Sequence, residues 1–186
     1  MTTDTEPPVG LGQLLQDTRT LVATLQRSPD DHQDACARLT DSVLRPLSTI
    51  VGLTPADDQD GHSPEPQPVR QLDASVWELA RSVTTLYAAQ STSAELGEAA
   101  AAVQDLAIAL TDDAPQAAER LAELQTLQAA LRPRIQCAHN GPYVVTNVSR
   151  VVDWLGRPLP ERPTLALCRC GASSTKPLCD GSHKRI

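Results

Sequence analysis

The residues of this chain that are best suited to bind a metal gather near its C-terminal end. Three of its five cysteines and one of its four histidines lie within the sixteen residues from Cys168 to His183. A C-x-C pair on extended backbone brings the thiolates of Cys168 and Cys170 close enough for one metal. Cys179 and His183 are four positions apart, so on one helical turn they also face one point. The spacing therefore predicts two adjacent irons, each held by one pair of side chains.

The residues between the two pairs are typical of a tight loop. Four of them are turn-formers that offer hydroxyl or backbone N–H groups to inorganic sulfur: Gly171, Ser173, Ser174 and Thr175. Pro177 fixes one φ angle just before the second pair. We expect Asp180 to cap the last turn by accepting a hydrogen bond from the N–H of Ser182 or His183. Gly181 is expected to let the backbone come close to the metal.

This stretch resembles the signature of the CDGSH iron–sulfur domain family, the mitoNEET-like proteins. Every signature position is filled, in the order Cys168-x-Cys170-x-x-Ser173-x-x-x-Pro177-x-Cys179-Asp180-Gly181-Ser182-His183. The resemblance extends over residues 135–186 and covers none of the chain before them.

The resemblance implies one 2Fe-2S cluster per chain. Its ligands would be Cys168, Cys170, Cys179 and His183. By the same resemblance, Cys168 and Cys170 would hold the buried iron, and Cys179 and His183 the outer one. It also implies a homodimer with exchanged strands, although the long extension before the motif is a departure that bears on the dimer contacts.

A single histidine ligand has two physical consequences for such a cluster. A neutral imidazole in place of a negative thiolate favours the reduced state and raises the reduction potential, as in Rieske centres. An imidazole can also take up a proton and leave the metal. We therefore predict that the cluster is lost on acidification, and that His183 is the residue responsible.

The alternative to an iron–sulfur cluster is a structural zinc site with the same three cysteines and one histidine. Zinc knuckles usually separate paired cysteines by two residues, whereas one residue separates Cys168 from Cys170. This spacing favours iron and sulfur. Cys137 and His139 are candidates for further ligands, but we expect them to lie at the start of a strand without a metal.

Charge and composition divide the chain at about residue 132. Residues 1–132 carry a formal charge of −12 and residues 133–186 carry +5. An acidic body with no basic stripe argues against nucleic-acid binding. The first residues lack a basic and then apolar signal segment, and no run of about 18 apolar residues is long enough to span a membrane. We therefore expect a cytoplasmic protein, in which clustered cysteines are metal ligands or redox groups.

Apolar residues at three- and four-residue steps predict four or five helices that form a bundle over residues 10–132. The expected helices span residues 10–27, 31–53, 72–86, 96–110 and 113–131. Pro46 should kink or split the second of them. Residues 1–9 are expected to be disordered, and the proline-rich residues 54–70 to form a linker.

After Pro133 the sequence changes to short β-branched runs bounded by turn residues. Two strands are expected, at residues 143–148 and 164–167. The fold class is therefore α+β, with a helical bundle followed by a small β-containing domain at residues 133–186. About 50 residues give too little core for independent stability without a metal, a partner chain, or both.

These observations predict a redox protein that binds a 2Fe-2S cluster and acts in single-electron transfer, cluster transfer, or redox or pH sensing. The helical domain would serve oligomerisation or the choice of a redox partner or cluster acceptor. The alternative is a non-redox adaptor with a structural zinc site. No catalytic residue is predicted, because the helical body contains no phosphate loop, nucleophilic triad or Glu-x-x-His pair.

Overall fold

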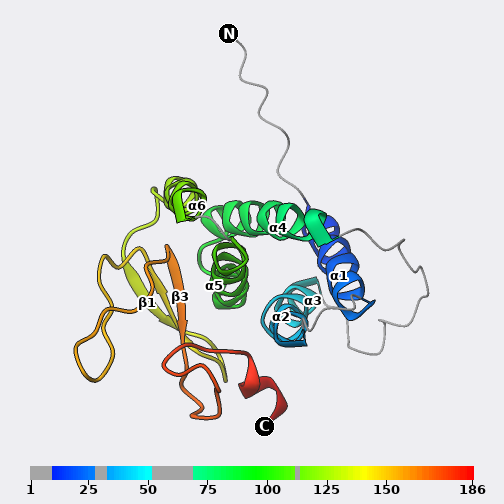
Figure 1. Cartoon of the computed structure of the whole chain (residues 1–186). Coiled ribbons are helices and arrows are strands. Elements are labelled where there is room, and N and C mark those ends of the chain that lie inside the picture. Colours follow the sequence, from blue (N-terminus) through cyan, green and yellow to red (C-terminus); the bar gives the residue numbers. More distant parts are fainter. Residues whose placement is uncertain (1–9, 28–32, 52–68, 112–113) are drawn as a thin grey trace.

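The computed structural model describes residues 10–27, 33–51, 69–111 and 114–186. Helices form the first part and a small antiparallel sheet the last, so the fold class is α+β, as the sequence predicts (Figure 1). The predicted disordered residues 1–9 and the predicted linker, as far as residue 68, lie outside the described residues.

The described chain contains the five helical runs that the apolar spacing predicts, and together we call them the helical body. They are α1 (Leu11–Arg27), α2 (Gln33–Leu39) with its continuation to Val51, α4 (Val69–Ala89), α5 (Ala94–Ala109) and α6 (Ala114–Leu127). Helix α5 is central and is buried on most of its faces. Its alanines allow close approach, so α5 contacts α4 on one side and the sheet on another.

A π-helical segment interrupts the second helical run just before Pro46, where the sequence predicts a kink or a split. Helix α2 continues into the π-helical segment η1 (Thr40–Leu44) and then into α3 (Arg45–Val51). Proline has no N–H, and its ring clashes with the carbonyl four residues earlier. The Arg45 N–H bonds to the carbonyl of Thr40, five residues back, so a widened turn accommodates the proline. This turn buries the polar side chains of Asp41 and Ser42.

The sheet has three antiparallel strands in the order β1-β2-β3, one more than the sequence predicts. They are β1 (Arg134–Cys137), β2 (Tyr143–Thr146) and β3 (Thr164–Leu167). Strand β1 contains arginine and glutamine and alternates over only four residues, which is too short a pattern to be distinctive. Strand β2 ends at Thr146, two residues before the predicted boundary, and the next residue, Asn147, has a positive φ of 50°.

Asn147 also explains why α6 ends at Leu127 rather than at the predicted residue 131. Its side-chain amide donates hydrogen bonds to the carbonyl oxygens of Gln128 and Leu131, at 2.7 and 2.8 Å. These carbonyls belong to the turn that follows α6. The carbonyl oxygens of this turn thus accept hydrogen bonds from Asn147, which follows β2, rather than from another helical turn.

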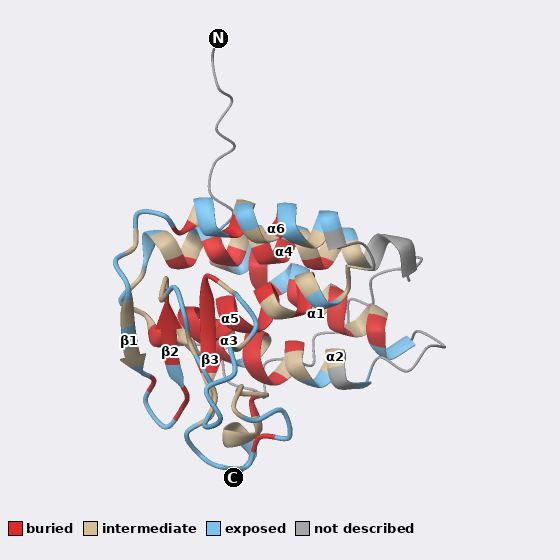
Figure 2. Ribbon diagram, turned by 60° about the vertical axis from the view of Figure 1, so that its left-hand side comes forward, coloured by how far each residue is buried: buried red, intermediate tan, exposed pale blue. Residues whose placement is uncertain are grey.

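Helix α5 packs directly on strands β2 and β3 (Figure 2). A side chain at Gly97 would place its Cβ 2.7 Å from Val144, so the helix and the sheet approach closely there. Further along, Gln104 donates to Gln128 at 2.5 Å, and Gln128 donates to Thr164 at 2.8 Å. The sheet therefore shares its buried face with the helical body, which supplies core that the last 50 residues lack.

Candidate metal centre

Strand β3 leads into a closed loop that carries three of the predicted ligands. The N–H of Cys168 bonds to the carbonyl of Pro177 at 2.9 Å, and the N–H of Cys179 bonds to the carbonyl of Ala166 at 2.8 Å. A bridge between Leu167 and Leu178 joins the two ends of the loop. Residues 168–179, the ligand loop, are thereby held with their first and last cysteines near the end of β3.

The first ligand pair has the spacing that one metal requires. The Sγ atoms of Cys168 and Cys170 lie 3.8 Å apart. Two thiolates that bind one tetrahedral metal at about 2.3 Å are separated by about 3.8 Å. Burial alone would raise the pKa of the Cys168 thiol, but hydrogen bonds from the backbone N–H groups of Ser173 and Gly171 outweigh it, so this pKa lies below its ordinary value. The loop thus favours the thiolate, which is the form that binds metal.

Asp180 joins the ligand loop to the turn that follows it. Its carboxylate accepts hydrogen bonds from the N–H and hydroxyl of Ser174, both at 2.9 Å, and from the N–H of Ser182 at 3.0 Å. The bond from Ser182 is the one that the sequence predicts, although the N-cap of the 3₁₀ helix that follows is Gly181 rather than Asp180. Burial raises the pKa of Asp180, but these hydrogen bonds outweigh it and hold the pKa well below its usual range.

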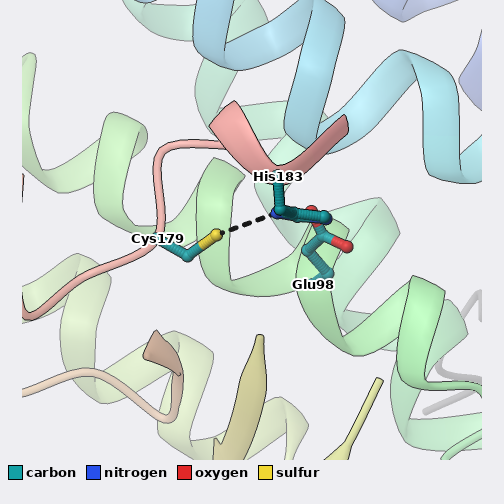
Figure 3. Close-up of side chains that lie close together, drawn as sticks. All are labelled: Glu98, Cys179 and His183. Atoms are coloured by element: carbon teal, nitrogen blue, oxygen red, sulfur yellow. Dashed lines mark hydrogen bonds and ion pairs between the residues drawn. The ribbon is translucent and has the colours of Figure 1, made fainter. Parts of the chain in front are cut away.

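The second ligand pair lies at the start of a short 3₁₀ helix, η3 (Ser182–Arg185), which we call the histidine turn. The Sγ of Cys179 and the Nδ1 of His183 lie 3.4 Å apart (Figure 3). A thiolate and an imidazole on one tetrahedral metal are separated by about 3.5 Å, from bond lengths of about 2.3 and 2.0 Å. This pair also fits a single metal.

The two pairs do not converge on one point. The described part of the chain contains one trio of potential ligand atoms that all lie within 4.8 Å of one another, and it consists of Glu98, Cys179 and His183. Neither Cys168 nor Cys170 belongs to such a trio. One tetrahedral ion would draw all four ligand atoms to within about 3.8 Å of each other. The donor set therefore fits two neighbouring metals better than one.

Comparison with known proteins agrees with this geometry. Residues 140–184 match the model of the family described as "Iron-binding zinc finger CDGSH type". The C-terminal region is a CDGSH iron-binding domain. No curated protein matches the chain significantly. The match includes both ligand pairs and strands β2 and β3 and none of the helical body, so the domain supports an iron–sulfur binding protein without describing what the helices do.

The helical body covers one side of the CDGSH domain, at the histidine turn. Lys184 Nζ lies 2.6 Å from the carbonyl oxygen of Asp41 in the π-helical segment and 2.7 Å from Oε1 of Glu98 on α5. Arg185 forms an ion pair with the Asp41 carboxylate. A Cβ at Gly181 would lie 2.7 Å from both Asp41 Cβ and Ser42 Oγ. The close approach that Gly181 permits is thus to the helix beside it.

Within the single chain, the two pairs differ in how open their ends are to solvent. Cys170, from the pair expected at the buried iron, is exposed. The His183 side chain, expected at the outer iron, is only 7% exposed because α5 lies against it. In the chain on its own, the helical body covers the histidine end of the CDGSH domain and leaves the C-x-C end open.

This burial changes the chemistry of the second pair. Burial raises the pKa of the Cys179 thiol to about 11, and the nearby carboxylate of Glu98 adds to the shift. Burial and then the positive charge of Lys184 lower the pKa of His183. Burial likewise raises the pKa of Glu98, although Lys184 opposes this. The neutral imidazole is the metal-binding form of His183, whereas the Cys179 thiol has to lose its proton to bind.

Glu98 and Asp41 could not be predicted from the sequence as neighbours of the metal centre, because neither residue lies in a recognisable motif. Glu98 follows Gly97 and precedes a run of four alanines, where a carboxylate is expected to face solvent. Cys137 and His139, by contrast, are exposed and take no part in the trio of close ligand atoms. Within the described residues, no helix is long and apolar enough to cross a membrane.

Proposed function

We propose that this chain binds one 2Fe-2S cluster through Cys168, Cys170, Cys179 and His183 and acts as a redox protein. The observation that carries the proposal is the division of the donors into two pairs. Each pair has single-metal spacing, at 3.8 and 3.4 Å, and the pairs do not converge on a single ion. Bound there, a 2Fe-2S cluster would supply one-electron chemistry with a potential raised by its histidine ligand.

The protein's own groups would stabilise such a cluster in two ways. Backbone N–H groups of the ligand loop point at thiolate sulfur, as in the bond from Ala172 to Cys170 Sγ at 3.4 Å. Hydrogen bonds of this kind raise the potential by offsetting negative charge. The exposed Cys170 end is the side from which an electron-transfer partner or a cluster acceptor would approach.

Purified full-length protein tests this proposal directly. We expect a red-brown solution with two irons and two acid-labile sulfides per chain, and visible absorbance that dithionite bleaches. A colourless protein with one zinc per chain would instead establish the structural adaptor and exclude the redox role. Iron analysis alone is insufficient, so sulfide and zinc are measured on the same sample.

A homodimer remains part of the proposal. Large apolar side chains are exposed in the C-terminal region, among them Ile135 on the edge strand β1 at 66% and Trp154 at 76%. Exposed apolar residues on an edge strand are typical of surfaces that pair with another chain. The molar mass of the cluster-loaded protein by light scattering distinguishes a dimer from a monomer, and Trp154→Ser should shift a dimer towards monomer.

A further inference from the structure

The two ring nitrogens of His183 face different parts of the molecule. Nδ1 lies 3.4 Å from Cys179 Sγ, and Nε2 lies 3.6 Å from Oε1 of Glu98 (Figure 3). A neutral imidazole that binds metal through one nitrogen carries its proton on the other. If Nδ1 is the ligand, the proton is on Nε2 and points to the helical body.

Glu98 is a charged residue at a buried position of α5, which is unusual. Its side chain is 5% exposed, and the residues around it on α5 are buried and mostly alanine. A carboxylate in such a place is costly unless it is paired. Lys184 Nζ, at 2.7 Å from Oε1 of Glu98, and His183 Nε2, at 3.6 Å, both come from the histidine turn. Glu98 therefore interacts with the segment that carries the metal ligand.

We propose that Glu98 is a positioning residue of the metal centre, whose carboxylate accepts the Nε2–H of His183 and directs Nδ1 at the metal. This inference rests on the proposed function. The separation of 3.6 Å is longer than a hydrogen bond, so the inference requires that it shortens when His183 binds metal. Carboxylates commonly hold ligating histidines in this way, which fixes the tautomer and increases the basicity of the ligand.

The position of Glu98 is set by how α5 packs on the sheet. Gly97, one residue earlier, allows α5 to approach Val144, because any Cβ there would lie 2.7 Å from that side chain. At the other end of the contact, the N–H of Thr164 donates to Gln104 at 3.0 Å. These two contacts fix the register of α5 against β2 and β3. The helical body is thereby part of the metal centre as well as a cover for it.

The first experiment compares Glu98→Gln with Glu95→Gln in the cluster-loaded protein. Glu95 lies one turn earlier on α5 and has no contact with His183, so its substitution removes the same charge without removing the acceptor. We expect the Glu98→Gln variant to lose its visible absorbance about tenfold faster than wild type, and to have a higher reduction potential. The Glu95→Gln variant should stay close to wild type in both measurements.

The second experiment separates positioning from structural support. In a His183→Cys background the fourth ligand has no Nε2–H, so Glu98→Gln should change the potential and the rate of cluster loss much less than in wild type, with only the effect of its charge left. An equal effect in both backgrounds would overturn the inference. Because Glu98→Gln removes the carboxylate that pairs with Lys184, the neutral pair Glu98→Gln/Lys184→Gln is measured alongside, and it should also lose its visible absorbance faster than wild type.

These results also separate the inference from the function on which it rests. A coloured wild type whose Glu98→Gln variant matches it in potential and stability overturns the positioning role and leaves the cluster intact. A colourless, zinc-bound wild type overturns both. Pulsed EPR of the reduced protein, labelled with ¹⁵N-histidine, gives an independent readout, because the remote-nitrogen coupling should differ between Glu98→Gln and wild type.

Discussion

The two halves of the ligand set carry similar donors in opposite surroundings. Cys168 and Cys170 belong to an open loop whose backbone N–H groups lower the pKa of the Cys168 thiol. Cys179 and His183 lie against α5 and the π-helical segment, where burial raises the pKa of the Cys179 thiol to about 11. Local backbone hydrogen bonds thus favour the metal-binding thiolate in the first pair, whereas residues from a distant part of the sequence surround the second pair.

This difference shows that the CDGSH motif and its surroundings are separable. The ligand loop makes most of its contacts within itself, for example from Ser173 to the carbonyl of Leu178 at 2.7 Å. The histidine turn makes its contacts with Glu98 and Asp41, which lie far away in the sequence. A helical body attached to this domain can therefore act on the cluster through its histidine end.

The largest effect that we expect from this contrast is in thiol reactivity. In the metal-free protein at pH 8, iodoacetamide should modify Cys168 faster than Cys179, on the order of tenfold or more, because the pKa of Cys168 lies below its ordinary value and that of Cys179 is raised to about 11. Peptide mass spectrometry over time measures both rates, with exposed Cys137 as an internal reference. Equal rates for Cys168 and Cys179 would contradict the difference in environment.

The second-largest effect is expected on acidification, which acts on His183. As the pH falls from 8 to about 5, protons compete with metal for the imidazole, and we expect wild type to lose its colour about tenfold faster than His183→Cys. The pKa of His183 is lowered by burial and Lys184, so protonation and cluster loss begin at a lower pH than an ordinary histidine would give. If His183→Cys fades as fast as wild type, the histidine is not the acid-sensitive ligand.

Two glycine substitutions measure how firmly the histidine turn is seated on the helical body. Gly181 and Gly156 have φ values of 85° and 78°, so alanine at either position costs about 1–2 kcal/mol in backbone strain. Only Gly181→Ala also collides with Asp41 and Ser42, at 2.7 Å, which adds about 1–3 kcal/mol. The free energy of unfolding should therefore fall further for Gly181→Ala than for Gly156→Ala. Equal losses would mean that the turn is not pressed against the helix.

The smallest effect is expected at the two candidate ligands that the structure leaves exposed. Cys137→Ser and His139→Ala should retain iron, sulfide and visible absorbance at the wild-type level, since neither side chain joins the close ligand atoms. Metal analysis of the purified variants checks this. A loss of iron from either variant would add that residue to the ligand set.

Much of this protein could be predicted from local spacing. The leucine and alanine stripes predicted the five helical runs, and the change to short β-branched runs after Pro133 predicted the sheet. Spacing also paired Cys168 with Cys170 and Cys179 with His183, and both pairs have single-metal distances. These features follow from contacts between residues close in sequence, whose geometry the backbone periodicity sets.

The tertiary structure alone decided what surrounds the ligands. Sequence patterns did not predict strand β1, the π-helical turn before Pro46, or the contacts of Glu98 and Asp41 with the histidine turn. The face of α5 that meets the sheet depends on how closely small residues such as Gly97 allow the helix and the sheet to approach. The residues next to Glu98 in the sequence do not indicate which group its carboxylate will contact. Residue types determined which groups can bind a metal, and long-range packing determined which end of that site is buried.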